Sequence, residues 1–323
     1  MQAIQVSRTG GPEVLEVVEL PDPEPGEGEL LVELAAAGVN YIDTYQRSGL
    51  YPTPTPFVCG MEGAGRVVAV GPGVADFAAG DRVAWKAAPG SYAQRVVVPA
   101  AEALAVPDAV SDEAAAAVLL QGLTAHYLVT SSYPIKLGDT VLVHAAAGGV
   151  GLLLTQLAVA RGGRVIGTVS TEEKQRLAHD AGAAEVIRYT EVDDLAGRVR
   201  SLTDGKGVAA VYDGVGAATF DASLASLRPR GMLVLFGASS GPVPAFEPLR
   251  LAAAGSLFLT RPVLSHYTAT RDELAWRARE VFEAVVAGDL RVHIGARFAL
   301  ADARTAHEQL QARKTTGKVL LLP

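Results

Sequence analysis

The stretch Thr140-Val-Leu-Val-His144-Ala-Ala-Ala-Gly148-Gly149-Val150-Gly151 decides the fold of this chain. It begins with an almost continuously apolar run, which is typical of a parallel strand covered on both faces. The glycines that follow let the backbone approach an anion at the N-terminus of the next helix. The helix runs on through Leu152–Ala160, and a second apolar strand, Arg164–Val169, completes a βαβ unit. This pattern predicts a site for the pyrophosphate of a dinucleotide.

Around this unit the sequence alternates between strands and helices. Six strands with crossovers of this length predict an α/β fold with a Rossmann doubly wound parallel six-stranded sheet. The predicted strands are 140–144, 164–169, 184–189, 208–213, 231–236 and 256–260.

The segments that precede and follow this part of the sequence have other patterns of apolar residues. Residues 1–121 contain short alternating runs broken by Gly and Pro, which predicts a β-rich, barrel-like domain. The tail, 262–323, carries a helical pattern from Arg271 to Ala287 and a last strand, Lys318–Leu322. Because about 60 residues are few for an independent core, we expect the tail to return to the first domain. The predicted division is therefore 1–121, 122–261 and 262–323.

Composition narrows the classes of function. The 323 residues are 49% hydrophobic, carry a formal net charge of −7 and contain no Lys/Arg block, which argues against a nucleic-acid surface. Cys59 is the only cysteine, so no internal disulfide can form, and we expect it in the core. No apolar run approaches the ~20 residues of a membrane span. The first eight residues resemble an opening strand more than a signal peptide, so the expected location is the cytoplasm.

Several motifs occur in the order seen in the medium-chain dehydrogenase/reductase superfamily. Within it, the chain resembles the zinc-independent, zeta-crystallin-like quinone oxidoreductases over its whole length. The resemblance implies a GroES-like β-rich catalytic domain interrupted by the Rossmann domain, and a homodimer that pairs through the strand around Ser256–Thr260. The motifs are Gly38-Val-Asn40-Tyr-Ile-Asp43-Thr-Tyr45, Ser48-Gly-Leu-Tyr51-Pro52, Gly60-Met61-Glu62-Gly63-Ala-Gly65, Gly80-Asp81-Arg82-Val83 and Ala145–Gly151.

Zinc ligands of the related alcohol dehydrogenases are missing from these motifs. Met61 stands where those enzymes have a ligating His, and no Cys stands shortly before Val39-Asn40-Tyr41, where those enzymes have a second ligand. We therefore predict no metal, and we expect Glu62 to be a structural carboxylate.

The substrate expectation follows from the missing zinc. Hydride transfer to a simple ketone creates a strongly basic alkoxide, which needs a Lewis acid or a nearby proton donor. Reduction of a quinone creates a delocalised phenolate, for which orientation of the reactants suffices. The resemblance favours a quinone, and reduction of an enone or enal remains the alternative. A non-catalytic NADPH-binding role, as a sensor or structural protein, is an alternative of another class.

The end of the second strand indicates which dinucleotide binds. NAD-binding Rossmann units usually carry an acidic residue there, whereas this chain has Ser170 and Thr171. By resemblance, Lys174 binds the 2′-phosphate and Tyr189 lies beside the adenine, so the expected cofactor is NADPH. In the alternative interpretation, Ser170 and Glu173 form a capping box and Lys174 is a solvated surface cation.

The remaining site residues come mainly from the resemblance. Asn40, Asp43, Tyr45 and Tyr51 match positions around the nicotinamide and the substrate, where the tyrosines could stack on a flat acceptor. As ordinary structural residues, the tyrosines would pack and Asp43 would cap a turn. The full set of expected cofactor-binding residues is Asn40, Tyr45, Thr124, Ala147, Gly148, Gly149, Val150, Gly151, Gly167, Thr168, Ser170, Lys174, Tyr189, Phe236, Gly237, Ser240 and Arg313. Three of these positions also have a structural alternative, in which Thr124 is an ordinary helix residue, Phe236-Gly237 is a strand-to-loop turn and Arg313 is an exposed helix end.

Overall fold

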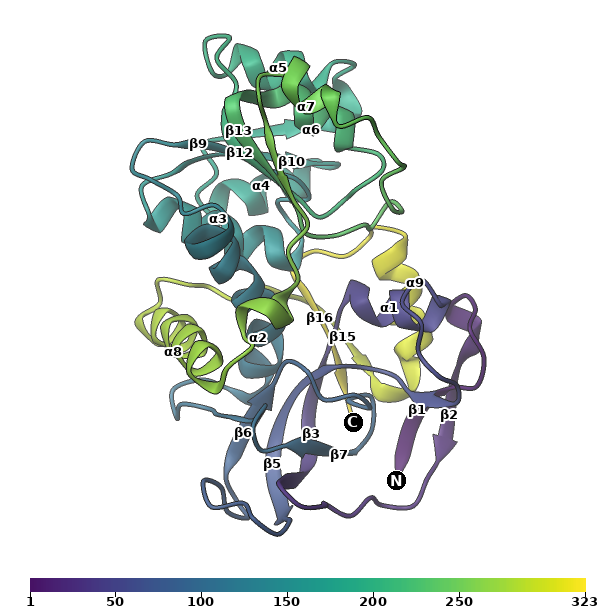
Figure 1. Cartoon of the computed structure of the whole chain (residues 1–323). Helices are drawn as coiled ribbons and strands as arrows, with labels where there is room; N and C mark the ends of the chain where they lie inside the picture. Colours follow the sequence, from purple (N-terminus) through teal and green to yellow (C-terminus); the bar gives the residue numbers. More distant parts are fainter. The chain divides into compact units, whose positions relative to one another are not determined.

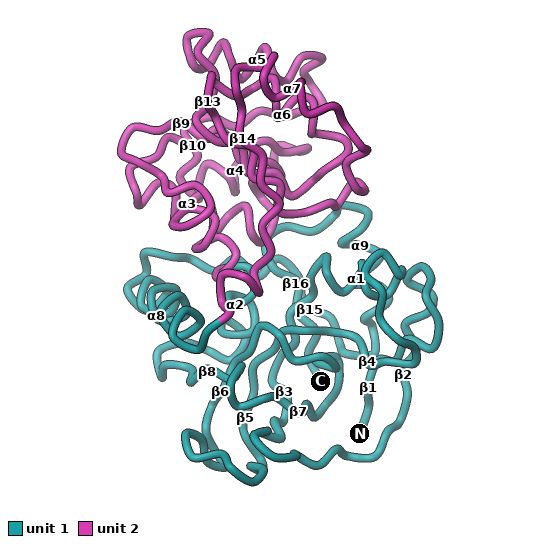
Figure 2. Tube along the Cα trace, in the orientation of Figure 1, with its two compact units in different colours: residues 1–121, 270–323 teal, residues 122–269 magenta.

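The computed structural model describes residues 1–323 and contains two compact units. The first unit consists of Met1–Gln121 and Thr270–Pro323, and the second of Gly122–Ala269 (Figure 2). Residues 262–269, which the sequence division placed with the tail, belong to the second unit.

The second unit is built on one parallel six-stranded sheet with the order β11-β10-β9-β12-β13-β14. Strands β9, β10, β12 and β13 of this sheet are labelled in Figure 1. The α/β Rossmann expectation is confirmed. Helices α3, α4 and α6 pack against its strands, and the core includes Leu142, Ile166 and Val211. The elements are β9 (Thr140–Val143), α3 (Gly149–Ala160), β10 (Arg164–Val169), α4 (Glu172–Asp180), β11 (Glu185–Arg188), α5 (Leu195–Ser201), β12 (Val208–Asp213), α6 (Phe220–Ser226), β13 (Leu227–Leu235), α7 (Leu249–Ala253) and β14 (Phe258–Thr260).

The first unit holds a seven-stranded sheet and a three-stranded sheet of order β2-β1-β4. In the larger sheet the order is β15-β16-β3-β5-β6-β8, and β7 also pairs with β3. The strands are β1 (Gln2–Val6), β2 (Leu15–Glu19), β3 (Glu29–Val39), β4 (Phe57–Val58), β5 (Glu62–Val70), β6 (Arg82–Trp85), β7 (Arg95–Pro99), β8 (Leu104–Ala105), β15 (Ile294–Ala299) and β16 (Lys318–Leu322). The last strand, β16, is antiparallel to β3 and parallel to β15, so the tail does complete this sheet.

Four longer helices belong wholly or partly to the first unit: α1 (Tyr41–Ser48), α2 (Asp112–Tyr127), α8 (Arg271–Ala287) and α9 (Ala303–Gln311). Thr270 caps α8 by accepting a hydrogen bond from Glu273 N, and Gly288 ends it with a φ of 80°. Short 3-10 helices lie at Pro12–Val14, Tyr189–Glu191, Leu264–Tyr267 and Leu300–Asp302, and a short π-helix, Leu128–Ser132, follows α2.

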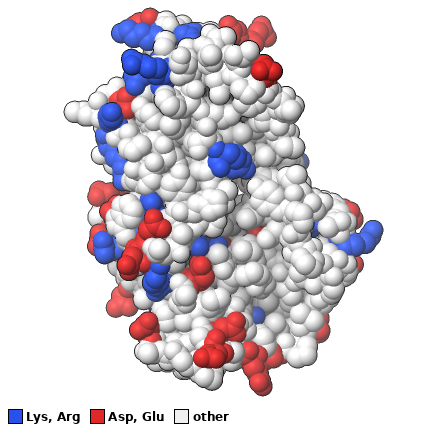
Figure 3. All heavy atoms as spheres, in the orientation of Figure 1, with Lys and Arg blue, Asp and Glu red and all other residues white.

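Although no uninterrupted apolar run approaches the length of a membrane span, one helical segment, Asp112–Ser132, is long and apolar enough by length and average composition to cross a membrane. However, 78% of its apolar window is buried within the protein, as in a core helix. On the face shown in Figure 3, basic side chains gather along the upper left edge, acidic side chains dominate the lower edge, and the two kinds are mixed along the left side.

Candidate active site and cofactor cradle

The turn between β9 and α3 forms a cradle of backbone atoms, Ala145–Gly151. Gly148 is the N-cap of α3 and no side chain caps the helix. The amides of the first helical turn have no partner within the helix, and they carry its positive dipole end. A Cβ on Gly151 would lie 2.3 Å from Ala145 O, so only glycine permits this turn. The cradle therefore fits the pyrophosphate of a dinucleotide.

The end of β10 carries the residues expected to select the cofactor. Thr171, and not Ser170, is the N-cap of α4, because its hydroxyl accepts a hydrogen bond from Lys174 N at 3.3 Å. The Ser170–Glu173 capping box was thus a wrong alternative. Lys174 is half-buried in the first turn of α4, and Tyr189 is 38% exposed at the end of β11. Thr190 Oγ1 donates to Ser170 O, which joins the ends of these neighbouring strands.

The other expected cofactor residues of this unit differ in how accessible they are. Phe236, Gly237 and Ser240 follow β13 and are half-buried, although the Ser240 hydroxyl already donates to Val215 O and accepts from Ala218 N. Thr168 is only 1% exposed, and Thr124 is 8% exposed within α2. Gly167 is buried, and a Cβ there would lie 2.8 Å from Ala146 Cβ, so Gly167 makes room for the cradle.

In the first unit, Asn40 lies between β3 and α1 and is 4% exposed. Its Nδ2 donates to Gly38 O at 3.2 Å and to Glu62 Oε2 at 2.9 Å. Its Oδ1 accepts from Lys318 Nζ at 2.8 Å and from Gln121 Nε2 at 3.3 Å. These four bonds use the full capacity of the amide. This arrangement favours a positioning role for Asn40.

Glu62 and Lys318 form a fully buried ion pair beside Asn40, with side chains 0% and 1% exposed. Glu62 Oε1 also accepts from Leu120 N at 2.7 Å. Gly38 leaves space for the pair, since a Cβ there would lie 2.4 Å from Glu62 Oε2. Glu62 is therefore a structural carboxylate, as expected. Lys318 is not among the predicted site residues, although a charged residue at the start of an otherwise apolar strand is a signal for a buried pair.

A second buried chain of hydrogen bonds ends on Asp43. Arg47 Nη1 lies 3.3 Å from His307 Nδ1, and because a guanidinium only donates, the proton of the imidazole is on Nε2. His307 Nε2 donates to the Tyr92 hydroxyl at 3.2 Å, and Tyr92 donates to Asp43 Oδ2 at 2.8 Å. Burial and the charge of Arg47 lower the pKa of His307 to about 3, so the ring is neutral. Arg47, Tyr92 and His307 are not among the predicted site residues.

Asp43 itself is 0% exposed, and its Oδ2 also accepts from Asn40 N at 2.8 Å, which caps α1. Its Oδ1 is buried without a partner. Burial raises the pKa of Asp43 to about 7, with a smaller raising contribution from Glu62, while the hydrogen bonds and Lys318 oppose the shift. These contacts favour the structural alternative, in which Asp43 caps a turn and positions α1.

This pKa predicts a pH dependence of stability. The folded state binds the Asp43 proton more tightly than the unfolded state does. The contribution of this proton to the free energy of unfolding of the wild type is therefore lost as the pH rises from about 4 to about 7. Asp43→Asn cannot titrate there, so we expect the wild-type advantage in free energy of unfolding to shrink across this range. Urea titrations of both proteins at pH 5, 6, 7 and 8 measure it, and a constant difference would contradict the prediction.

Three tyrosines lie together on α1 and directly after it. The Tyr45 ring is 5.2 Å from that of Tyr51 and 6.2 Å from that of Tyr41. Tyr51 is 40% exposed and Tyr45 is half-buried, so these two expected substrate residues are neighbours with exposed surface. Arg313 is exposed beyond the end of α9 and has a φ of 57°.

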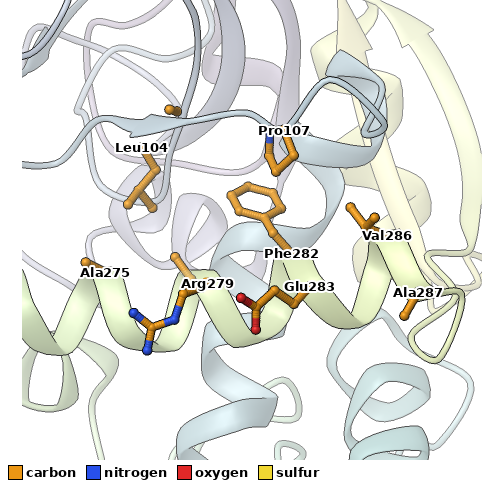
Figure 4. A pocket seen from close by; sticks show the side chains of 10 residues that line it. Leu104, Pro107, Ala275, Arg279, Phe282, Glu283, Val286 and Ala287 are labelled. Carbon is orange, nitrogen blue, oxygen red and sulfur yellow. The ribbon is translucent and has the colours of Figure 1, made fainter.

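The first unit also contains an apolar pocket of about 530 Å³ between α8 and the segment 104–107. Figure 4 shows Leu104, Pro107 and Phe282 lining it, with Arg279 and Glu283 on α8. None of the predicted site residues lines this pocket, so it is separate from the tyrosine group and from Asn40.

Potential metal ligands do not come together in this structure. Side chains of His, Cys, Asp and Glu form no group of three or more that could hold a metal ion. Met61 Sδ instead contacts Gln46 Nε2 at 3.7 Å, and Cys59 is a buried free cysteine in the core, as expected.

Known protein families match both units of the chain. The family described as alcohol dehydrogenase GroES-like domain matches residues 26–108, and the family described as zinc-binding dehydrogenase matches residues 149–276. A quinone oxidoreductase of Pseudomonas aeruginosa is 48% identical over 99% of each chain. A 2-haloacrylate reductase of a Burkholderia species is 41% identical over 100% of this chain and 99% of its own.

Solved structures show the same relationship. A mycobacterial protein in complex with NADPH superposes with a TM-score of 0.98 at 58% identity, covering 100% of both chains. An Escherichia coli quinone oxidoreductase in complex with NADPH gives a TM-score of 0.98 at 45% identity, again over 100% of both chains. The chain combines a GroES-like unit with a Rossmann unit, and it belongs to the quinone oxidoreductases of the medium-chain dehydrogenase/reductase superfamily.

Proposed function

We propose that this protein reduces quinones with NADPH by hydride transfer and without a metal. The observation that carries the proposal is the end of β10, where Ser170, Thr171 and the half-buried Lys174 stand beside the glycine cradle in place of an acidic residue. A cation at this place suits a 2′-phosphate, whereas a carboxylate would repel it. The full-length relatives named as quinone oxidoreductases, and the neighbours solved with NADPH, support the same assignment.

The residues of the chain have distinct tasks in this proposal. The first amides of α3 bind the pyrophosphate, Lys174 binds the 2′-phosphate and Tyr189 contacts the adenine. NADPH, when bound, supplies the hydride. Tyr45 and Tyr51 hold the flat acceptor by ring contacts, and Asn40 with Lys318 fixes the backbone before α1. The negative charge of a reduced quinone is delocalised over its ring, so orientation suffices without a Lewis acid.

Reduction of an electron-poor alkene is the second candidate. The 41% identical 2-haloacrylate reductase supports it, because hydride addition to the β-carbon of such a substrate yields a delocalised enolate. Both reactions would use the same cradle, and neither needs a zinc ion. The two candidate reactions therefore differ only in the acceptor that is reduced.

We further propose a cytoplasmic homodimer that forms through β14. This strand is at the edge of the six-stranded sheet, and Phe258 on it is 56% exposed. An exposed edge strand offers unpaired backbone groups to a second copy.

The deciding experiment measures initial rates of NADPH and NADH oxidation by chelator-treated protein with a small quinone or a small enone. We expect rapid quinone-dependent oxidation of NADPH. Lys174→Ala should raise the KM for NADPH by roughly 10–100-fold, the value of a charged hydrogen bond, and leave NADH use unchanged. The exposed Lys206, in the same unit, gives the control Lys206→Ala, which should behave as wild type.

Each other outcome has a definite meaning. Turnover of the enone alone would replace the substrate and keep the cofactor assignment. NADPH binding without turnover of either acceptor would favour the non-catalytic role, and equal use of NADH by wild type would contradict selection by Lys174.

A further inference from the structure

A buried chain of four side chains lies at the carboxyl ends of β9, β10 and β12, in the second unit. His144 Nδ1 is 2.9 Å from Thr168 Oγ1, and His144 Nε2 is 3.0 Å from Ser223 Oγ. Ser223 in turn donates to Asp213 Oδ2 at 2.7 Å. All four side chains are 2% exposed or less. The chain thus joins three strand ends and α6 away from solvent.

The direction of each hydrogen bond follows from the surroundings of Asp213. Its Oδ1 accepts from Val215 N at 2.8 Å and Gly216 N at 3.0 Å, and Thr219 Oγ1 also donates to it. Every group around the carboxylate is therefore a hydrogen-bond donor, and the Ser223 hydroxyl donates its hydrogen bond to Asp213. The Ser223 oxygen then accepts from His144 Nε2–H.

With the proton on Nε2, the His144 Nδ1 atom accepts from the Thr168 hydroxyl. Burial lowers the pKa of His144, with Asp213 opposing the shift, so the neutral ring is favoured. Both ring nitrogens are satisfied, and the chain runs in one direction from Thr168 to Asp213. An imidazole held in this way has one orientation.

This imidazole belongs to the residue immediately before the cradle. His144 N donates to Tyr212 O at 3.1 Å, and Ala146 N donates to Thr168 O at 3.1 Å. Between them, Ala145 adopts a φ of 50°, and its carbonyl oxygen is the atom that Gly151 must approach. The position of the cradle thus depends on where His144 and Thr168 are held.

We propose that His144, Thr168, Ser223 and Asp213 are positioning residues of the dinucleotide site, which hold the cradle so that the first amides of α3 are preorganised for a pyrophosphate. This inference rests on the proposed use of NADPH. It assigns Thr168 a role through His144, in contrast to the direct cofactor contact that the family resemblance implies. Preorganisation lowers the entropic cost of binding, so its loss should weaken affinity more than turnover.

The test compares NADPH affinity, by fluorescence titration, with quinone reduction at saturating NADPH. His144→Phe keeps an aromatic ring but removes both hydrogen bonds, and we expect the Kd for NADPH to rise at least tenfold while kcat changes less than threefold. Thr168→Val should also raise the Kd for NADPH, whereas Thr168→Ser, which keeps the hydroxyl, should have the wild-type Kd. In the double variant, Thr168→Val should add nothing to His144→Phe, because both cut the same chain.

The matched control is His307→Phe, which removes an equally buried, doubly bonded histidine from the other unit. It should lower the melting temperature without changing the Kd for NADPH. The inference would be overturned if His144→Phe and Thr168→Val had additive effects on the Kd for NADPH. Wild-type affinity in His144→Phe, or an equal loss of affinity in His307→Phe, would also overturn it. If His144→Phe does not fold, wild-type affinity in Thr168→Val overturns it instead. Wild-type protein that fails to bind NADPH would refute the proposed function itself.

Discussion

Lys318→Met is expected to lower the free energy of unfolding by about 3–5 kcal/mol, the cost of leaving one buried charge without its partner. Glu62 is 0% exposed, and after the substitution only Asn40 Nδ2 and Leu120 N would still donate to it. Asn40 would also lose one acceptor contact at its Oδ1. Urea unfolding, followed by circular dichroism, measures the change. We also expect kcat to fall, since Asn40 would be less firmly held.

Two controls separate the ion pair from general damage. Arg304→Met breaks an exposed pair with Glu308 one helical turn away, and it should change stability little. The double variant Glu62→Gln with Lys318→Met removes both charges and should recover part of the loss. If Lys318→Met unfolds like wild type, the buried pair does not stabilise this unit.

Gly151→Ala is expected to abolish measurable NADPH binding, with a loss of at least 100-fold in affinity. The added Cβ would lie 2.3 Å from Ala145 O and 2.8 Å from Ala146 Cα, so the backbone of the cradle must move. The amides of α3 would then no longer converge on the pyrophosphate. Fluorescence titration with NADPH measures the loss, and overpacking should cost about 1–3 kcal/mol of stability as well.

Gly65→Ala is the matched control for this strain. A Cβ on Gly65 would lie 2.1 Å from Glu33 O, so the clash with backbone is similar but lies in the first unit. It should destabilise the protein and leave NADPH affinity unchanged. Normal NADPH affinity in Gly151→Ala would contradict the role of the cradle as the anion site.

The sequence predicted the parallel sheet well because its strands are buried on both faces. Strands 164–169 and 208–213 coincide with β10 and β12, and the helix predicted at Arg271–Ala287 coincides with α8. The start of β13 at Leu227 was missed, because Arg228, Pro229 and Arg230 interrupt its apolar pattern. The start of a short edge strand is also weakly marked in sequence, and β14 begins two residues later than predicted.

The candidate site was less accessible to sequence reasoning. The glycine cradle is a local pattern, so its residues could be found from spacing alone. The partners of Asp43 and Glu62 could not, because Tyr92 and Lys318 are far away along the chain and only the fold brings them near. The same holds for His307, which hydrogen-bonds Tyr92. The helix cap at Thr171 was placed one residue early, since adjacent Ser and Thr residues offer the same hydroxyl.

The position of β16 has a consequence for biosynthesis. This strand lies between β15 and β3, yet the ribosome makes it after every other strand of that sheet. The second unit is synthesised in one continuous piece and can fold first, whereas the first unit waits for residues 318–322. Until then, Glu62 lacks its cation and β3 has an open edge. A nascent or truncated chain without this strand should therefore be a preferred client of chaperones and proteases.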